Sequence, residues 1–320
     1  MREQKEKRNH HYIPIFHLAN FTKKGTKDST LYAFDTLTGN QHDSKPKSVA
    51  FSKKLYSIEL PDTPSDLIEN TFMDLETKTA PIIRNLCETN QMPVDSDYNY
   101  LMNYLALLEV RTPTMRESFS GLMEDMLKSI MHEMVATEER FEATRKGMAN
   151  EGYKLPISPY MKIKEFVQED RYSISFNNNN HVHNVLHAMD AIIQPLSSRN
   201  WSIVYCPNTL GDFICSDHPV SLHWIKKKER GVFSSPGHGL LGTEVTVPLS
   251  SRVMLLGRFE KYMPNKIVLD SRLNLAILNS YSSMNCSRFI FSRKEDFVWY
   301  TNEDKIGTLA DFRRAILKEK

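Results

Sequence analysis

Three adjacent side chains near the start of the chain could take part in catalysis or bind a metal. They are His10, His11 and Tyr12, in an aromatic, strand-like stretch. Neighbouring residues of a strand point to opposite faces, so at most one of the two histidines can enter a given site. Histidine suits acid–base chemistry and metal binding because its pKa lies near neutrality. The alternative is a structural pair, with one ring buried and hydrogen-bonded and the other on the surface.

A single arginine stands where a predicted helix is cut short. Arg111 is followed by Thr112 and Pro113, and proline interrupts a helix because it lacks the backbone donor. The guanidinium could cap carbonyl groups at the helix end. It could equally project its planar fork toward an anion. The residues alone leave both roles open.

A polar corner follows an apolar strand at residues 213–219. Within it, Asp217 could hold a metal, act as a base or orient His218. Ser216 and Asp217 are also natural turn residues that bond back to their own backbone, so a structural corner is the alternative. The glycines that form the sharp turn around the nucleophile of many serine hydrolases are missing around Ser216, which argues against that class.

A predicted helix carries two histidines and an aspartate on one face. His183 and His187 are four residues apart, and Asp190 follows three residues later. Such side chains share a helix face, and the spacing allows two or three metal ligands. The sequence therefore predicts a possible divalent metal site here, with solvated surface histidines as the alternative.

Composition excludes some classes of protein and leaves others open. The 320 residues carry a formal net charge of +2, which neither requires nor excludes a nucleic-acid partner. The basic run 226–230 could contact phosphate or form a solvated hairpin loop. The four cysteines lack the spacing of a zinc or redox motif and are expected to be reduced thiols. Phosphate-loop, dinucleotide-binding and kinase motifs are missing.

The chain shows neither a secretion signal nor a membrane span, so we expect a cytoplasmic protein. Residues 1–8 are of mixed charge and predict a flexible leader. The longest apolar run, residues 101–110, has about half of the ~20 residues that a spanning helix needs.

Hydrophobic periodicity predicts an α+β fold in one domain over residues 1–320. Residues 30–35 and 47–51 predict an N-terminal β-hairpin that joins the sheet. A helical half covers residues 63–198, with Pro81 expected to kink or break its first helix and with one long helix running from Pro113 to residue 146. A β-rich half covers 199–300 and a closing helix covers 305–318. We expect a helical layer packed on a mainly antiparallel sheet, without any internal repeat.

Four segments together resemble a known family. They are residues 9–14 (NHHYIP), residues 111–113 (RTP), Trp201 followed by residues 213–219 (FICSDHP), and residues 247–250 (VPLS). In this order they are similar to the bacterial domain-of-unknown-function family 4238, and residues 288–292 also fit. The resemblance implies that five polar positions belong to the family pattern, namely His10, His11, Tyr12, Arg111 and Asp217. It implies no reaction.

Two classes of function follow from these residues. The first is a nuclease-like hydrolase acting on a phosphodiester of a nucleotide or nucleic acid, with His10 or His11 as acid or base, Asp217 as base or ligand, and Arg111 neutralising charge on phosphorus. The second is a non-catalytic sensor or binding module for an anionic ligand or a protein partner. If Arg111 and Asp217 work in the site, Arg111→Lys and Asp217→Asn should lose activity without much loss of stability.

Overall fold

Two antiparallel strands bring the N-terminal histidines to the body of the protein. The computed structural model describes residues 9–154, 158–226, 235–301 and 305–318. Strand β1 (Asn9–His11) pairs with β4 (Phe51–Lys53). Pro14 then precedes the short helix α1 (Ile15–Ala19). The alternation of β1 buries His10 and leaves His11 partly exposed.

The predicted N-terminal hairpin is present, with a different return strand. Strand β2 (Leu31–Asp35) pairs with β3 (Gln41–Ser44), and Gly39 in the turn has a φ of 71°, which favours glycine. Residues 47–51 do not return the hairpin, because a 3-10 turn at Pro46–Ser48 separates β3 from β4. The hairpin joins β11 (Phe289–Ser292) and β6 (Cys215–Ser216) in a four-stranded antiparallel sheet, order β3-β2-β11-β6.

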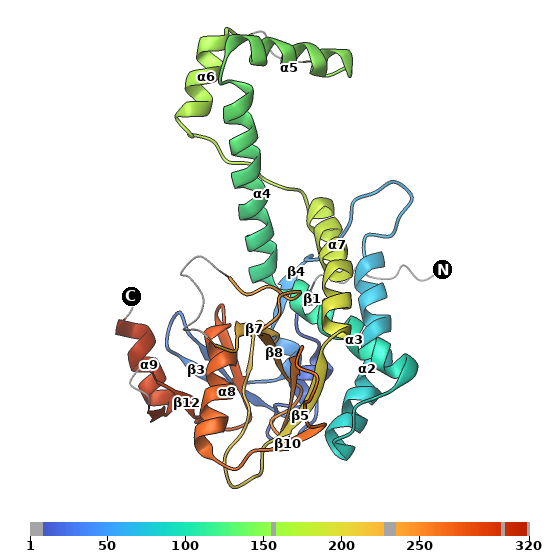
Figure 1. The fold of residues 1–320 in the computed structure, drawn as a ribbon, viewed down its shortest axis with the longest axis vertical. Coiled ribbons are helices and arrows are strands. Elements are labelled where there is room, and N and C mark those ends of the chain that lie inside the picture. The colour runs from blue at the N-terminus through green and yellow to red at the C-terminus, as the bar shows by residue number, and fades with distance from the viewer. Residues whose placement is uncertain (1–8, 155–157, 227–234, 302–304, 319–320) are drawn as a thin grey trace.

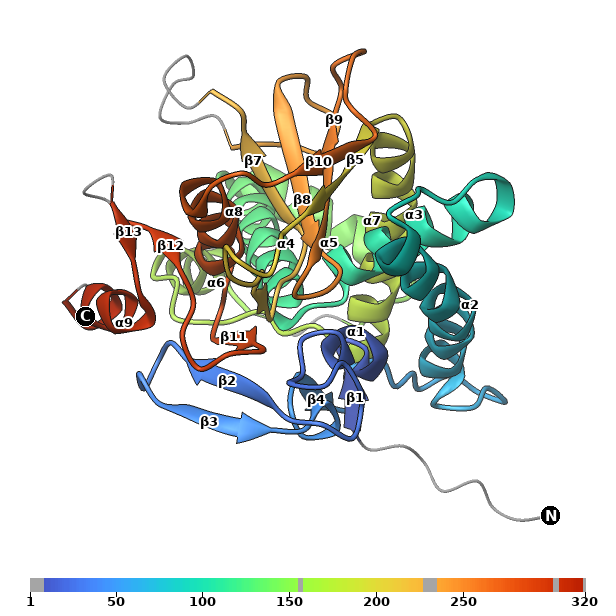
Figure 2. The ribbon, with the colours of Figure 1, turned by 90° about the horizontal axis from the view of Figure 1, so that it is seen from below.

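A larger sheet forms the centre of the C-terminal half. Its order is β10-β5-β9-β8-β7, and all neighbouring pairs are antiparallel except β10 with β5. Sequence periodicity did not predict β10, which has only three residues. Figure 2 shows this sheet beside the β2–β3 hairpin. Its strands are β5 (Asn200–Tyr205), β7 (Ser221–Trp224), β8 (Thr243–Pro248), β9 (Val253–Arg258) and β10 (Lys266–Val268).

Three helices form one layer beside the sheet, as the hydrophobic periodicity predicts (Figure 2). They are α2 (Leu67–Thr89), α3 (Asp95–Val110) and α7 (Asn178–Ser197). One buried cluster joins Leu105 of α3 with Val245 and Leu255 of the sheet. Helix α2 continues through Pro81, so of the predicted kink or break the break is wrong. Pro81 and Thr77 are exposed, so water can bond to the Thr77 carbonyl that proline leaves without a donor.

The remaining helices of the middle segment extend away from the sheet. Figure 1 shows α4 (Pro113–Met134) projecting from the body, with α5 (Glu138–Asn150) and α6 (Tyr160–Gln168) at its far end. Neither α4 nor α5 has a buried residue. The predicted helical layer is therefore correct for α2, α3 and α7 only. The expected single helix to residue 146 divides at Val135, and Thr137 caps α5.

The C-terminal part completes the α+β fold. Helix α8 (Arg272–Met284) precedes β11, and a small hairpin of β12 (Trp299–Tyr300) and β13 (Ile306–Gly307) leads to α9 (Leu309–Lys318). None of the helices in the described ranges has the length and apolar character needed to cross a membrane.

Candidate functional site

A cleft separates the N-terminal segment from helix α2. Its volume is about 1000 Å³. The ionisable side chains that line it are His11, Lys27, Glu69, Glu76 and Arg84. The sequence predicted His11 at a site. It did not predict Glu69 and Glu76, although their spacing of seven residues places both on one face of α2.

His11 is the histidine that reaches the cleft. It is partly exposed, and its Nε2 lies 3.3 Å from the carbonyl oxygen of Lys47. Burial lowers the pKa of His11 below its usual range, and nearby Arg111 adds to the effect. The ring is therefore neutral at pH 7 and can accept a proton.

His10 lies behind the cleft and is held by the backbone. Its side chain is fully buried, stacks on the ring of Tyr56, and accepts a hydrogen bond of 2.9 Å at Nδ1 from the backbone N–H of Tyr56. The Glu69 carboxylate is 4.0 Å from the same nitrogen. Because the lone pair of Nδ1 accepts this hydrogen bond, Nδ1 carries no proton to donate to Glu69. The structure therefore places His10 as a structural residue next to the cleft.

Arg111 connects the cleft to the interior. Its side chain is 1% exposed, and Nη1 donates to Glu76 Oε1 at 2.6 Å while Nη2 donates to the backbone carbonyl of His11. Burial opposes the charge of the guanidinium, but Glu76 outweighs it and raises the pKa of Arg111. The hydroxyl of Tyr56 donates to the Arg111 carbonyl. This guanidinium fixes neighbouring groups and does not line the cleft.

Asp217 and Tyr12 lie elsewhere in the interior. Asp217 is 5% exposed, and its carboxylate accepts hydrogen bonds of 2.7–2.9 Å from the backbone N–H groups of Ser287, Arg288 and Phe289. Burial, and then the charge of Asp217, raise the pKa of Tyr12, so its phenol stays neutral. Among the described residues, those lining the cleft include neither Asp217 nor Tyr12. Two residues that the family pattern groups with His11 therefore do not line the cleft that His11 reaches.

His218 belongs to a second polar cluster, which we call the Glu109 cluster. Glu109 Oε2 accepts from His218 Nε2 at 3.0 Å, and Oε1 accepts from His238 Nε2 at 3.1 Å. Burial would raise the pKa of Glu109, but these hydrogen bonds lower it to about 2. Burial likewise opposes the charge of His218, yet Glu109 raises the pKa of that ring. The cluster joins helix α3, the corner after β6 and the segment before β8.

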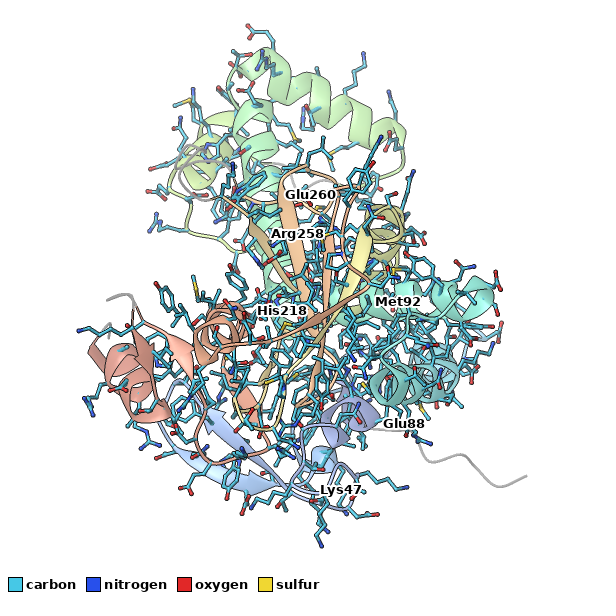
Figure 3. All side chains as sticks on the ribbon, turned by 60° about the horizontal axis from the view of Figure 1, so that its bottom comes forward. Lys47, Glu88, Met92, His218, Arg258 and Glu260 are labelled. Carbon is cyan, nitrogen blue, oxygen red and sulfur yellow. The ribbon has the colours of Figure 1, made fainter. Side chains whose placement is uncertain are left out.

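Figure 3 shows His218 near the centre of the molecule, whereas Lys47 lies at the edge that carries the N-terminal strands. His218 is not among the residues that line the cleft beside His11. Glu109 and Arg111 are two residues apart at the end of α3, so their side chains leave the helix in different directions. This spacing was visible in the sequence, but His238, distant in the chain, gave no signal.

The predicted metal ligands come together only in part. The Nε2 atoms of His183 and His187 are 3.0 Å apart. Asp190 does not complete a site, because the part of the chain that the structure describes holds no group of three His, Cys, Asp or Glu side chains arranged for a metal. Of the basic run 226–230, all but Lys226 lies outside the described residues. The four cysteines are free thiols.

Comparison with known proteins identifies the family. The model of the family described as "Protein of unknown function (DUF4238)" matches residues 9–296. The chain therefore belongs to this family, and the resemblance of its four segments is confirmed. Neither the curated proteins nor the solved structures contain a match to the chain.

Proposed function

We propose that, in this member of the DUF4238 family, the cleft beside His11 is the active site of a nuclease-like hydrolase that cleaves a phosphodiester of a nucleotide or nucleic acid. The observation that carries the proposal is that His11 lines a cavity of about 1000 Å³ together with the cations Lys27 and Arg84. Pockets of this size hold ligands as large as nucleotides. The free thiols fit the reducing cytoplasm, which is the location we propose.

His11 has the tautomer and charge of a general base. A carbonyl oxygen only accepts hydrogen bonds, so the contact with Lys47 places the ring proton on Nε2. The lone pair on Nδ1 is then available to take a proton from a water molecule. As the water oxygen bonds to phosphorus, the bond to the leaving oxygen breaks, and that oxygen keeps the electron pair and is protonated by solvent.

The charges around the cleft suit an anionic substrate. Lys27 and Arg84 are exposed and can neutralise phosphoryl oxygens. Arg111 is a positioning residue in this scheme, because it holds the backbone of His11 and the carboxylate of Glu76. The ion pair also neutralises Glu76, which would otherwise repel a phosphate.

A divalent metal in the cleft is not part of the proposal. Carboxylates such as Glu69 and Glu76 are common ligands of hard cations. Here Glu76 is already paired with Arg111 at 2.6 Å, and the described residues provide no group of three ligands. We therefore assign the chemistry to His11 and to the cations.

A second candidate is a binding module that holds an anionic ligand without cleaving it. The observation that favours it is that the carboxylate of Asp217 already accepts hydrogen bonds from three backbone N–H groups and does not line the cleft as a second catalytic group. In this case Lys27 and Arg84 bind the ligand, and His11 contributes a hydrogen bond only.

One set of variants tests both candidates. Cleavage of labelled single-stranded oligonucleotides and of a dinucleotide is measured for the parent, for His11→Ala and for His42→Ala, an exposed histidine on β3. Loss of a general base should lower the rate by about 10²-fold or more, while His42→Ala keeps the parental rate. Binding without cleavage, weakened by Lys27→Ala but not by Lys24→Ala, would establish the binding module. Both candidate functions would be overturned if the parent protein neither bound nor cleaved these substrates.

A further inference from the structure

Two exposed histidine rings on helix α7 contact each other through their Nε2 atoms. His183 and His187 are both exposed, and their ring centroids are 4.2 Å apart. Val182 and Val185, on the other side of the helix, are buried. The helix is therefore anchored by one face, and the two rings project from the opposite face at a fixed spacing of one turn. Figure 1 shows α7 beside the base of α4.

The distance between the Nε2 atoms of the two rings is also close to the distance between two nitrogen ligands of one metal ion. The Nε2 atoms are 3.0 Å apart. Two nitrogen ligands held about 2.1 Å from one ion are about 3.0 Å apart at a right angle and about 3.4 Å apart at a tetrahedral angle. The observed distance matches the right angle, which square-planar and octahedral ions prefer. Among borderline ions with imidazole ligands, Cu²⁺ and Ni²⁺ have this preference.

We propose that His183 and His187 form a two-ligand surface site for Ni²⁺ or Cu²⁺. The remaining positions of the ion are filled by water, because both rings face solvent. In the metal-free protein one ring donates its Nε2 proton to the other. On binding, the donor ring moves this proton to Nδ1, so that both Nε2 lone pairs point to the ion and the charge of neither ring changes.

The site is independent of the proposed hydrolase. The residues that line the His11 cleft are drawn from the N-terminal segment and from α2, and they do not include these two histidines of α7. The predicted contribution of Asp190 is not required, since two imidazole nitrogens at adjacent corners already chelate the ion. A failure of the metal site therefore leaves the hydrolase proposal unchanged, and the reverse also holds.

Calorimetric titration of the full chain, purified without a histidine tag, with NiCl₂ or CuCl₂ tests the proposal. We expect about one ion per chain, and His183→Ala and His187→Ala should each weaken binding at least tenfold. His181→Ala is the matched control, because it removes a histidine from the same helix at a position two residues away. It should bind as the parent does.

Two results would overturn the site. One is that the His183→Ala and His187→Ala variants bind the metal as tightly as the parent does, since the ion would then bind elsewhere. The other is no uptake by the parent at millimolar metal. Helix content measured by circular dichroism separates loss of ligands from loss of fold. His183→Gln and His187→Gln, which retain a polar side chain, should lose the metal as the alanine variants do.

Discussion

The guanidinium of Arg111 donates a hydrogen bond to the backbone carbonyl oxygen of His11. A buried charge at the end of α3 thereby fixes the strand residue that faces the cleft. The same guanidinium holds Glu76 of α2 on the opposite wall. One side chain therefore sets the spacing between the two sides of the cleft.

Arg111→Lys should destabilise the protein. Lysine keeps the charge but has a single ammonium group, which cannot reach both the His11 carbonyl and Glu76 with the geometry of the fork. A buried polar group left without its partner costs about 1–3 kcal/mol, and we expect a loss of that size in urea unfolding. Arg84→Lys, at an exposed position of α2, should leave the unfolding midpoint unchanged. A stable Arg111→Lys protein would show that the two contacts contribute little.

Asp217→Asn should also destabilise the protein more than it affects activity. The aspartate carboxylate accepts from three backbone N–H groups at the turn into β11, and an asparagine oxygen replaces only part of this acceptor. Charged acceptors contribute about 1.5–3 kcal/mol per hydrogen bond, so a marked fall in the melting temperature is expected. Activity per folded molecule should remain. Loss of activity without loss of stability would return Asp217 to the site, as the sequence suggested.

Local patterns predicted the fold better than they predicted the site. Hydrophobic alternation identified β2 and the strands β5, β7, β8 and β9 of the main sheet but missed β10, and proline with threonine marked the boundary between Arg111 and α4. The sequence could not show that α4 leaves the body, because its apolar residues have the same periodicity as those of a packed helix. Leu122 of α4 and Leu105 of α3 illustrate the difference, since they are 66% and 0% exposed.

The contacts that form the site join residues far apart in the sequence, and local sequence patterns cannot predict such contacts. The family pattern groups His11, Arg111 and Asp217, but the side chain of Arg111 donates to Glu76, and that of Asp217 accepts from the backbone of residues 287–289. Both are side chains for which the sequence left a structural role open. No periodicity could pair Glu109 with His238, which are 129 residues apart.

A matched pair of leucines tests the packing of the projecting helices. Leu105→Ala removes a fully buried side chain from the core and should cost about 2–5 kcal/mol. Leu122→Ala, at an exposed site of α4, should change the unfolding free energy by less than about 0.5 kcal/mol. Comparable losses in the two variants would show that α4 is covered in solution, and sedimentation velocity would then reveal association.

The Glu109 cluster should make stability depend on pH in both directions. The folded pKa of Glu109, about 2, lies below its unfolded value of about 4.3. Its contribution is therefore complete above that unfolded value and is lost as pH falls toward 2. The folded pKa of His218 is raised, so its contribution is complete below the unfolded value of about 6.5 and is lost as pH rises through the folded pKa. Together, Glu109 and His218 should stabilise the folded protein most at a pH between the two unfolded pKa values, about 4.3 and about 6.5.

Urea unfolding of the parent and of Glu109→Gln from pH 3 to pH 9 measures this dependence. The neutral amide cannot stabilise a protonated His218, so the variant should lose on the order of 2 kcal/mol near pH 5–6. The difference between the two proteins should shrink at either end of the range. Glu88→Gln, at an exposed position of α2 (Figure 3), should follow the parent throughout. The opposite outcome is a free energy of unfolding that differs between the parent and Glu109→Gln by the same amount at every pH. Packing alone, without the ionised carboxylate, would then account for the contribution of Glu109.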